Sequence, residues 1–209
     1  MYQLILKDVL LLKKILLLIL GFIVFFFILE NPPAFAVAIA GFIYISNSGS
    51  FDDRSHSNLM WNSLPISRAK IVSAKYVSII IFGLFIKGLV TVLQGLLYSV
   101  LNMYEQPFPE ANQLIIGFLI VLIVASVYYP IYYKFGEKYA RILMMIAVFG
   151  TVILGNMVWH LVSQYVENIL QILSQYSSEQ LIMFGIILTL LFFASSWLLS
   201  IKIYKEKDF

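Results

Sequence analysis

The chain has 209 residues and a formal net charge of +3; 61% of its residues are hydrophobic and 12% are charged. A soluble domain carries about 45–50% apolar and about 25% charged residues, so lipid rather than water must surround most of this chain. The absence of Cys excludes disulfides, thiolate catalysis and Cys-ligated metals.

The Lys and Arg residues fall into four clusters, with Lys87 alone inside an apolar run. The clusters span residues 7–14, 54–75, 134–141 and 202–207. The turns between them carry no basic residue and span residues 30–33, 105–110 and 167–179. This alternation is the positive-inside pattern, and it predicts an all-α membrane protein with six transmembrane helices and cytoplasmic N and C termini. The basic loops then meet anionic headgroups, so nucleic-acid binding is a poor interpretation of the positive charge.

The first predicted element is a helix over Met1–Lys14 that lies in the cytoplasmic interface, because apolar and charged residues alternate along it. Span 1 follows outward from Leu11 to Leu29, and Asn31-Pro32-Pro33 breaks the helix. Span 2 returns over Pro33–Asn47, which at about 15 residues is short, so it either crosses a thinned bilayer or continues through Ser48 and Gly49.

A signal peptide is the alternative interpretation of this start. Lys13-Lys14, the apolar run Ile15–Leu29 and Ala34-Phe35-Ala36 have the order of such a peptide and its cleavage motif. The sequence stays apolar through Ala36–Ile45, where a mature N-terminus would turn polar, so a retained helix is favoured.

Residues 48–74 form the longest polar segment, and the charge pattern places it, including the cytoplasmic segment 48–70, in the cytoplasm. Asp52 and Asp53 are predicted to lie in the first turn of a short helix capped by Ser50 and ended at Pro65. Leu59, Trp61 and Leu64 would be exposed on it. Two interpretations of Trp61 stay open: an anchor that docks a partner protein, or a ring among lipid headgroups.

Four further spans are expected. Span 3 runs outward over Ile71–Met103, span 4 returns over Asn112–Tyr133, and span 5 goes out over Arg141–Leu161. Tyr128, Tyr129, Tyr132 and Tyr133 are predicted to form an aromatic belt at the membrane surface beside Lys134. Residues 164–177 predict a short amphipathic helix on the outer face, and span 6 returns over Glu179–Ile203. The chain is therefore expected to be one transmembrane domain over residues 1–209.

Enzymatic motifs are missing. The sequence holds no phosphate-binding loop, dinucleotide fingerprint, zinc-protease motif or nucleophile elbow. His56 and His160 are the only histidines, and they are predicted on opposite sides of the membrane, so they cannot share a metal. No Asp or Glu is predicted inside the membrane, which argues against a carboxylate-based proton carrier. We therefore expect no catalytic residue, no metal site and no enzymatic activity in this chain.

Lys87 is the intramembrane residue with the strongest functional signal. A rise of about 1.5 Å per residue places it roughly 16 Å along span 3, where an ammonium must face protein or water. Thr91, Gln94 and Tyr98 follow on the same face, and Asn156 and His160 make a shorter polar stripe on span 5. One interpretation is a hydrated path that contacts amphipathic cargo; the other is a lysine packed between spans.

The segment Asn62-Ser-Leu-Pro-Ile-Ser-Arg-Ala-Lys-Ile-Val-Ser-Ala-Lys-Tyr76, preceded by Asp52-Asp53, resembles the signature of small ABC-2-type permeases, the membrane subunits of ATP-driven exporters. The opening Leu4-Ile-Leu-Lys-Asp8 and the closing Tyr204-Lys-Glu-Lys-Asp-Phe209 are also similar to the ends of that family. Within it, the chain is similar to permeases of phenol-soluble-modulin exporters and peptide-resistance transporters. The layout is similar over the whole chain, and the motif mainly over residues 52–76 and the termini.

The resemblance implies a coupling helix over about residues 50–64 that docks into a separate ATPase chain, which would bind ATP and Mg. The implied coupling residues are Asp52, Asp53, Arg54, Asn58, Leu59, Trp61, Leu64, Pro65 and Arg68. Two permease subunits, identical or related, would pair with two ATPase copies in a bacterial cell membrane.

The leading functional hypothesis is thus an exporter permease for hydrophobic or amphipathic cargo, with cytolytic or antimicrobial peptides as one candidate class. Two ATP-independent alternatives remain: a channel or carrier that uses Lys87, and an immunity protein that binds toxic peptides without moving them.

Overall fold

A computed structural model describes residues 2–54, 67–101, 108–146 and 175–207. All regular structure in these ranges is helical. The long helices are α1 (Tyr2–Ile28), α2 (Pro33–Arg54), α4 (Arg68–Leu101), α5 (Ala111–Phe135) and α7 (Ser178–Glu206), and residues 137–146 are also helical. The prediction of an all-α fold is confirmed for the part of the chain described.

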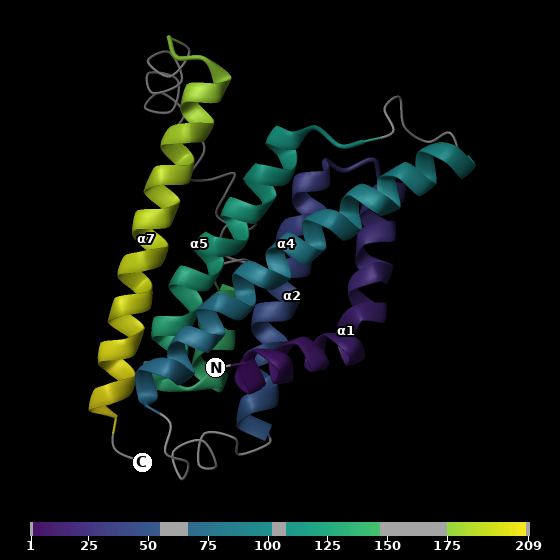
Figure 1. Ribbon diagram of the computed structural model, residues 1–209. Helices are drawn as coiled ribbons and strands as arrows, with labels where there is room; N and C mark the ends of the chain where they lie inside the picture. The colour runs from purple at the N-terminus through teal and green to yellow at the C-terminus, as the bar shows by residue number, and fades with distance from the viewer. Residues whose placement is uncertain (1, 55–66, 102–107, 147–174, 208–209) are drawn as a thin grey trace.

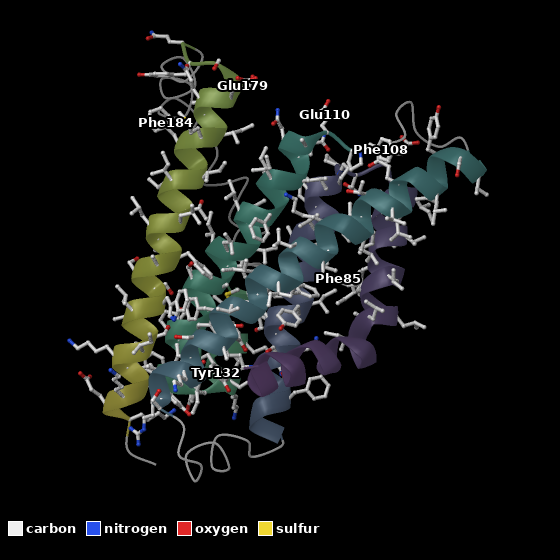
Figure 2. The ribbon with its side chains drawn as sticks, in the orientation of Figure 1. Phe85, Phe108, Glu110, Tyr132, Glu179 and Phe184 are labelled. Atoms are coloured by element: carbon white, nitrogen blue, oxygen red, sulfur yellow. The ribbon has the colours of Figure 1, made fainter. Side chains whose placement is uncertain are left out.

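The long helices form one bundle (Figure 1). Helix α1 first lies across one end of the bundle and then turns along it, α2 runs back beside it, and α4 crosses obliquely in front. Helix α5 packs between α2 and α7. The last residues of α2, α5 and α7 and the first of α4 lie at the same end, which we call the basal end; the other is the distal end. Figure 2 shows Glu110 and Glu179 at the distal end and Tyr132 towards the basal end.

Four of the described helices are long and apolar enough to cross a membrane, over Pro33–Phe51, Arg68–Val100, Ala111–Phe135 and Ser178–Glu206. The shorter apolar helix Ile15–Ile28 lies within α1. Large apolar side chains cover their outer surfaces, for example Leu17 at 83% exposure and Leu188 at 72%. Such surfaces are stable only in lipid or against other protein, so the chain is a multi-pass membrane protein.

Spans 2, 3, 4 and 6 of the predicted six therefore correspond to α2, α4, α5 and α7. Predicted span 1 falls in α1, which continues without a break from the segment expected at the interface. Span 5 begins in the helical residues 137–146, and the rest of it lies outside the described residues. The outer helix predicted over residues 164–177 also lies outside them, except residues 175–177, which are not helical. The count of six spans and the cytoplasmic location of the termini stay predictions.

The turn between α1 and α2 is a compact helix ending. The Asn31 amide donates to the Phe26 carbonyl (3.1 Å) and the Glu30 amide to that of Phe27 (3.0 Å). This pair of bonds is the Schellman arrangement, which places the residue after the helix in the left-handed region. Glu30 has the required φ of 55°. Pro33 then begins α2, where its missing amide hydrogen removes no helical bond.

Helices α2 and α5 approach closely because glycines stand where their backbones meet. A Cβ added to Gly117 would lie 2.7 Å from the Ala34 carbonyl oxygen, and one added to Gly41 would overlap the Val121 side chain. Small residues at such positions allow close packing between helices inside lipid, where no hydrophobic effect drives them together.

Pro130 interrupts the hydrogen bonding of α5, and α7 compensates for the loss. A proline inside a helix has no amide hydrogen for the carbonyl four residues earlier, here that of Ser126. The Ser196 hydroxyl of α7 donates to that carbonyl at 2.6 Å. The Tyr76 hydroxyl of α4 lies 2.8 Å from the hydroxyls of both Ser196 and Ser200. One buried polar cluster thus joins α4, α5 and α7.

The predicted aromatic belt is wrong. Tyr128 and Tyr129 are fully buried, and Tyr132 and Tyr133 are only 4% and 3% exposed. They pack on one another and, through Tyr133, on Tyr204 of α7, with ring centroids 5.0–6.2 Å apart. Because α5 lies between α2 and α7, its tyrosines meet protein rather than headgroups.

The N-terminal position predicted for the acidic pair is also wrong. Helix α2 continues through Ser48 and Gly49 to Arg54, so Asp52 and Asp53 lie in its last turn. Ser50 does not cap a new helix: its hydroxyl lies 2.8 Å from the Ser46 carbonyl one turn earlier. The polar run starting at Asn47 did not end the helix, since Ser48 and Ser50 are buried and contact Lys75 and Glu137 rather than water.

Candidate functional site

The site proposed for ATPase coupling lies at the basal end, between the last turn of α2 and the start of α4. Asp52, Asp53 and Arg54 are in that last turn, and Arg68 is the first residue of α4. Asn58, Leu59, Trp61, Leu64 and Pro65 lie outside the described residues. The structure therefore fixes the two flanks of the predicted coupling segment.

Arg68 ties one flank to the C-terminal helix. Its guanidinium Nη1 donates to the carbonyls of Lys205 and Lys207, each at 2.8 Å, and approaches that of Tyr204 at 3.5 Å. The last carbonyls of a helix have no partner within it and carry the negative end of its dipole, so a guanidinium stabilises them. The family resemblance implies a role in coupling for Arg68, and the structure shows its side chain bonded to the C-terminal end of α7.

Lys75 ties the same part of α4 to α2. Its side chain is 5% exposed, and Nζ lies 2.6 Å from the Ser48 hydroxyl and 3.4 Å from the Ser48 carbonyl. Further along, the rings of Tyr44 and Phe82 stack with centroids 4.0 Å apart. A buried ammonium is stable only with such polar partners, so the start of α4 is held on the end of α2.

The start of α4 is also fastened along α7. The Trp197 indole donates to the Ser73 hydroxyl at 3.0 Å, and its ring stacks on that of Tyr76 with centroids 5.6 Å apart and planes 7° apart. With the bonds from Tyr76 to Ser196 and Ser200, these contacts make the first turns of α4 and the last turns of α7 one packed unit.

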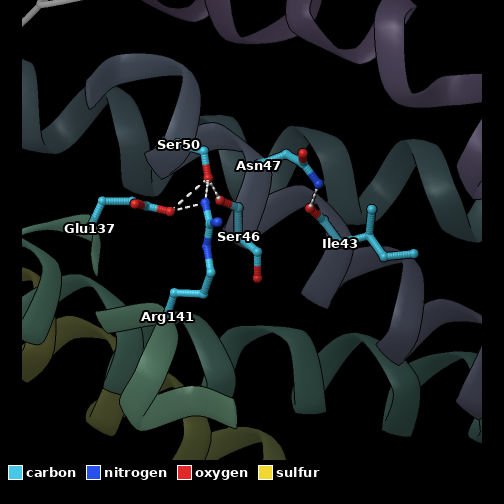
Figure 3. Close-up of polar contacts among 6 residues, drawn as sticks. All are labelled: Ile43, Ser46, Asn47, Ser50, Glu137 and Arg141. Atoms are coloured by element: carbon cyan, nitrogen blue, oxygen red, sulfur yellow. Dashed lines mark hydrogen bonds and ion pairs between the residues drawn. The ribbon is translucent and has the colours of Figure 1, made fainter. Parts of the chain in front are cut away.

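A second polar cluster joins α2 to the helical residues 137–146 (Figure 3). Arg141 forms an ion pair with Glu137 and donates to the Ser50 hydroxyl, which lies 2.8 Å from Glu137 Oε1. Asn47 donates to the Ile43 carbonyl at 2.8 Å. A cavity of about 320 Å³ lies beside this cluster, with Phe42, Phe51 and Met145 among its apolar walls. The cluster therefore joins the helical residues 137–146 to the last turns of α2.

The predicted stripe on α4 lies within one face of the helix, since its positions fall within about 60° at 100° per residue. Lys87 is half-buried, with Nζ 5.8 Å from the centre of the Phe118 ring. The Thr91 hydroxyl donates to the Lys87 carbonyl at 2.9 Å, Gln94 is 4% exposed and Tyr98 is 37% exposed. The stripe therefore runs along the border between the interior and the outer surface. Asn156 and His160 lie outside the described residues.

Sequence reasoning missed the polar residues that fasten the basal end. Lys75 was interpreted only as part of the basic start of span 3, Arg141 only as a topology anchor and Ser50 as a helix cap, while Ser48, Ser196 and Ser200 received no role. A signal was present, because hydroxyls four residues apart on an otherwise apolar helix lie on one face and need partners there.

The comparison with protein families matches residues 3–205 to the ABC-2 family transporter protein model, and the chain therefore belongs to that family. No curated protein and no solved structure matches significantly. Permeases of this family generally work with an ATPase partner, and the match identifies the chain as a transport subunit spanning a membrane.

Proposed function

We propose that this ABC-2 family chain is the permease subunit of an ATP-driven exporter that moves hydrophobic or amphipathic cargo outward. Peptides, including cytolytic or antimicrobial ones, are the cargo class that the sequence resemblance favours. A separate ATPase chain binds ATP and Mg, and two permease subunits pair around the path, each with one ATPase copy. The family match over residues 3–205 carries the transport assignment.

The geometry at the basal end supports coupling through residues 48–70. This segment includes the last residues of α2 and the first residues of α4. Arg68 begins α4, and its guanidinium bonds the carbonyls at the C-terminal end of α7. Lys75 holds the start of α4 on Ser48 of α2. A displacement of the segment by an ATPase would therefore act on α2, α4 and α7 together. The two polar ties make this transmission rigid rather than loose.

The face of α4 that carries Lys87 supports a path on this helix. No Asp or Glu occurs anywhere in α4, and among the described residues the ammonium of Lys87 lies against the Phe118 ring. A cation at this depth is costly unless water or protein surrounds it. Because the stripe borders the outer surface of the subunit, a second permease copy would complete the path there.

Coupling is tested by producing the chain with the ATPase encoded beside it and measuring complex yield and ATP hydrolysis. Trp61→Ala and Asp53→Asn should each lower both, since they remove an aromatic anchor and a fixed charge from the docking surface. Lys138→Gln is the matched control, because Lys138 is exposed at the basal end but lies in the helical residues 137–146. Unchanged complex and hydrolysis in both variants would show that the segment is not the docking surface.

The path is tested separately by exchanging its lysine. Lys87→Met should reduce export while leaving complex assembly intact, and Lys202→Met, an exposed lysine of α7, should leave export unchanged. Full export by a properly assembled Lys87→Met complex would instead assign Lys87 to packing.

A further inference from the structure

A groove between the basal ends of α5 and α7 has an apolar floor and a charged rim. Its volume is about 540 Å³, and Pro130, Ile131, Leu199 and Ile203 line the floor. Lys134, Lys207 and Glu206 lie at the rim. We propose that this α5–α7 groove binds one anionic phospholipid from the leaflet at the basal end.

The floor suits an acyl chain because it joins the surface that faces lipid. Leu199 is 50% exposed, and the neighbouring Leu198 and Leu191 of α7 are 70% and 67% exposed. A chain can therefore enter from the hydrocarbon sideways, without crossing water or displacing a buried side chain. The groove lies on the outside of the bundle, while the polar contacts of Lys75 and Tyr76 are buried within it. Lipid binding here would use the Lys207 side chain, whereas the proposed coupling contact uses only its main-chain carbonyl.

The rim suits a phosphate because two ammonium groups are held beside the floor. Lys207 Nζ donates to the Tyr133 carbonyl at 3.1 Å, which draws the C-terminal end of α7 against α5. Lys134 Nζ lies 5.2 Å from the centre of the Phe135 ring, and the structure shows it no ion pair with any described carboxylate. Among the described lining residues, the two lysines and Glu206 have a formal charge of +1 in sum.

Basic pockets between transmembrane helices on one side of a membrane are suited to anionic headgroups. Free phosphate shares the chemistry of the rim but makes no use of the floor. A phospholipid would use both, with its phosphate at the rim and an acyl chain on the floor. The apolar floor therefore favours a lipid over free phosphate.

The test uses the purified full chain and compares its thermal stability in detergent after adding phosphatidylglycerol, phosphatidylcholine with the same acyl chains, or inorganic phosphate. Phosphatidylglycerol should raise Tm more than the other two. The double variant Lys134→Gln/Lys207→Gln should bind it about 10–30-fold more weakly by native mass spectrometry, the effect expected of two lysines near a headgroup. Lys138→Gln/Lys202→Gln, which removes the same charge from exposed basal positions, should bind it as the wild type does.

A second variant keeps the charges and fills the floor. Leu199→Trp should also weaken phosphatidylglycerol binding, and because Leu199 is half exposed the protein should still fold. Equal stabilisation by the two lipids or by inorganic phosphate, equal losses in the two lysine double variants, or normal binding by Leu199→Trp would each overturn the proposal.

Discussion

Glu30 holds a backbone conformation that suits glycine better. Its φ of 55° costs a side chain about 1–2 kcal/mol, and the extra freedom of glycine in the unfolded chain offsets part of that. Glu30→Gly should therefore raise the free energy of unfolding by about 0.5–1 kcal/mol. Thermal unfolding in detergent measures the change.

Glu179→Gly is the control for Glu30, because it makes the same exchange in the first helical turn of α7. It should destabilise the chain by about 1 kcal/mol. A loss of stability in both variants would contradict the left-handed turn after α1.

The Ser196 hydroxyl replaces the hydrogen bond that Pro130 removes. Ser196→Ala leaves the Ser126 carbonyl without its donor and should cost about 0.5–1.5 kcal/mol. In a Pro130→Ala background the new amide hydrogen can reach that carbonyl, so the same exchange should cost clearly less. A double-mutant cycle followed by thermal unfolding measures the difference.

Ser195→Ala controls for loss of a hydroxyl, since Ser195 is exposed and its hydroxyl bonds, among the described residues, only the Phe192 carbonyl of its own helix. Its effect should be near zero. If Ser196→Ala costs the same with and without Pro130, the exchange of hydrogen bonds between α5 and α7 is refuted.

Side-chain environments were the least predictable feature from sequence. The tyrosines near the end of α5 have the composition of a membrane-surface belt, and their burial depends on α5 lying between two helices distant in sequence. From the sequence, Arg68 likewise looks like a basic residue of a loop. In the structure its guanidinium bonds the Lys205 carbonyl, 137 positions away. Composition and period carry no information about such contacts.

At the scale of helices, the close approach of α2 and α5 depends on Gly117. A Cβ there would meet the Ala34 carbonyl at 2.7 Å, and a backbone atom cannot rotate away as a side chain can. Gly117→Ala should therefore cost about 1–3 kcal/mol, measured by thermal unfolding.

Gly88→Ala is the matched control in α4. No atom of another described element lies within 4 Å of the added Cβ, so only helix propensity changes, and stability should rise by about 0.5–1 kcal/mol. A destabilisation no larger for Gly117→Ala than for Gly88→Ala would contradict the packing of α2 on α5.

The helices themselves were largely predictable, because about 20 apolar residues between polar turns are a strong signal. Spans 3, 4 and 6 agree with α4, α5 and α7 to within a few residues. The end of span 2 was predicted at Asn47, or at Gly49 in the longer alternative, and α2 continues to Arg54. Ser48 and Ser50 look like loop residues when their partners on other helices are unknown. The coupling helix itself stays a prediction, because residues 55–66 lie outside the described part of the chain.

At the scale of the whole molecule, the charge pattern predicted which ends lie together. The described basic segments, at the starts of α4 and of residues 137–146 and at the ends of α5 and α7, all gather at the basal end (Figure 1). The side of the membrane that this end faces was inferred from charge alone. The family match supports transport and an ATPase partner, whereas cargo and pairing rest on the proposal.

The chain contains no Cys, so one introduced cysteine is a unique chemical probe. Ser57→Cys lies in the predicted coupling segment and keeps the Trp61 anchor, and Phe108→Cys lies at the distal end (Figure 2), where Phe108 is 64% exposed. The decisive measurement is crosslinking from each cysteine to the ATPase in membranes that contain both chains. The account predicts a crosslink from position 57 and none from position 108. A crosslink from position 108, or none from position 57 in an assembled complex, would contradict it.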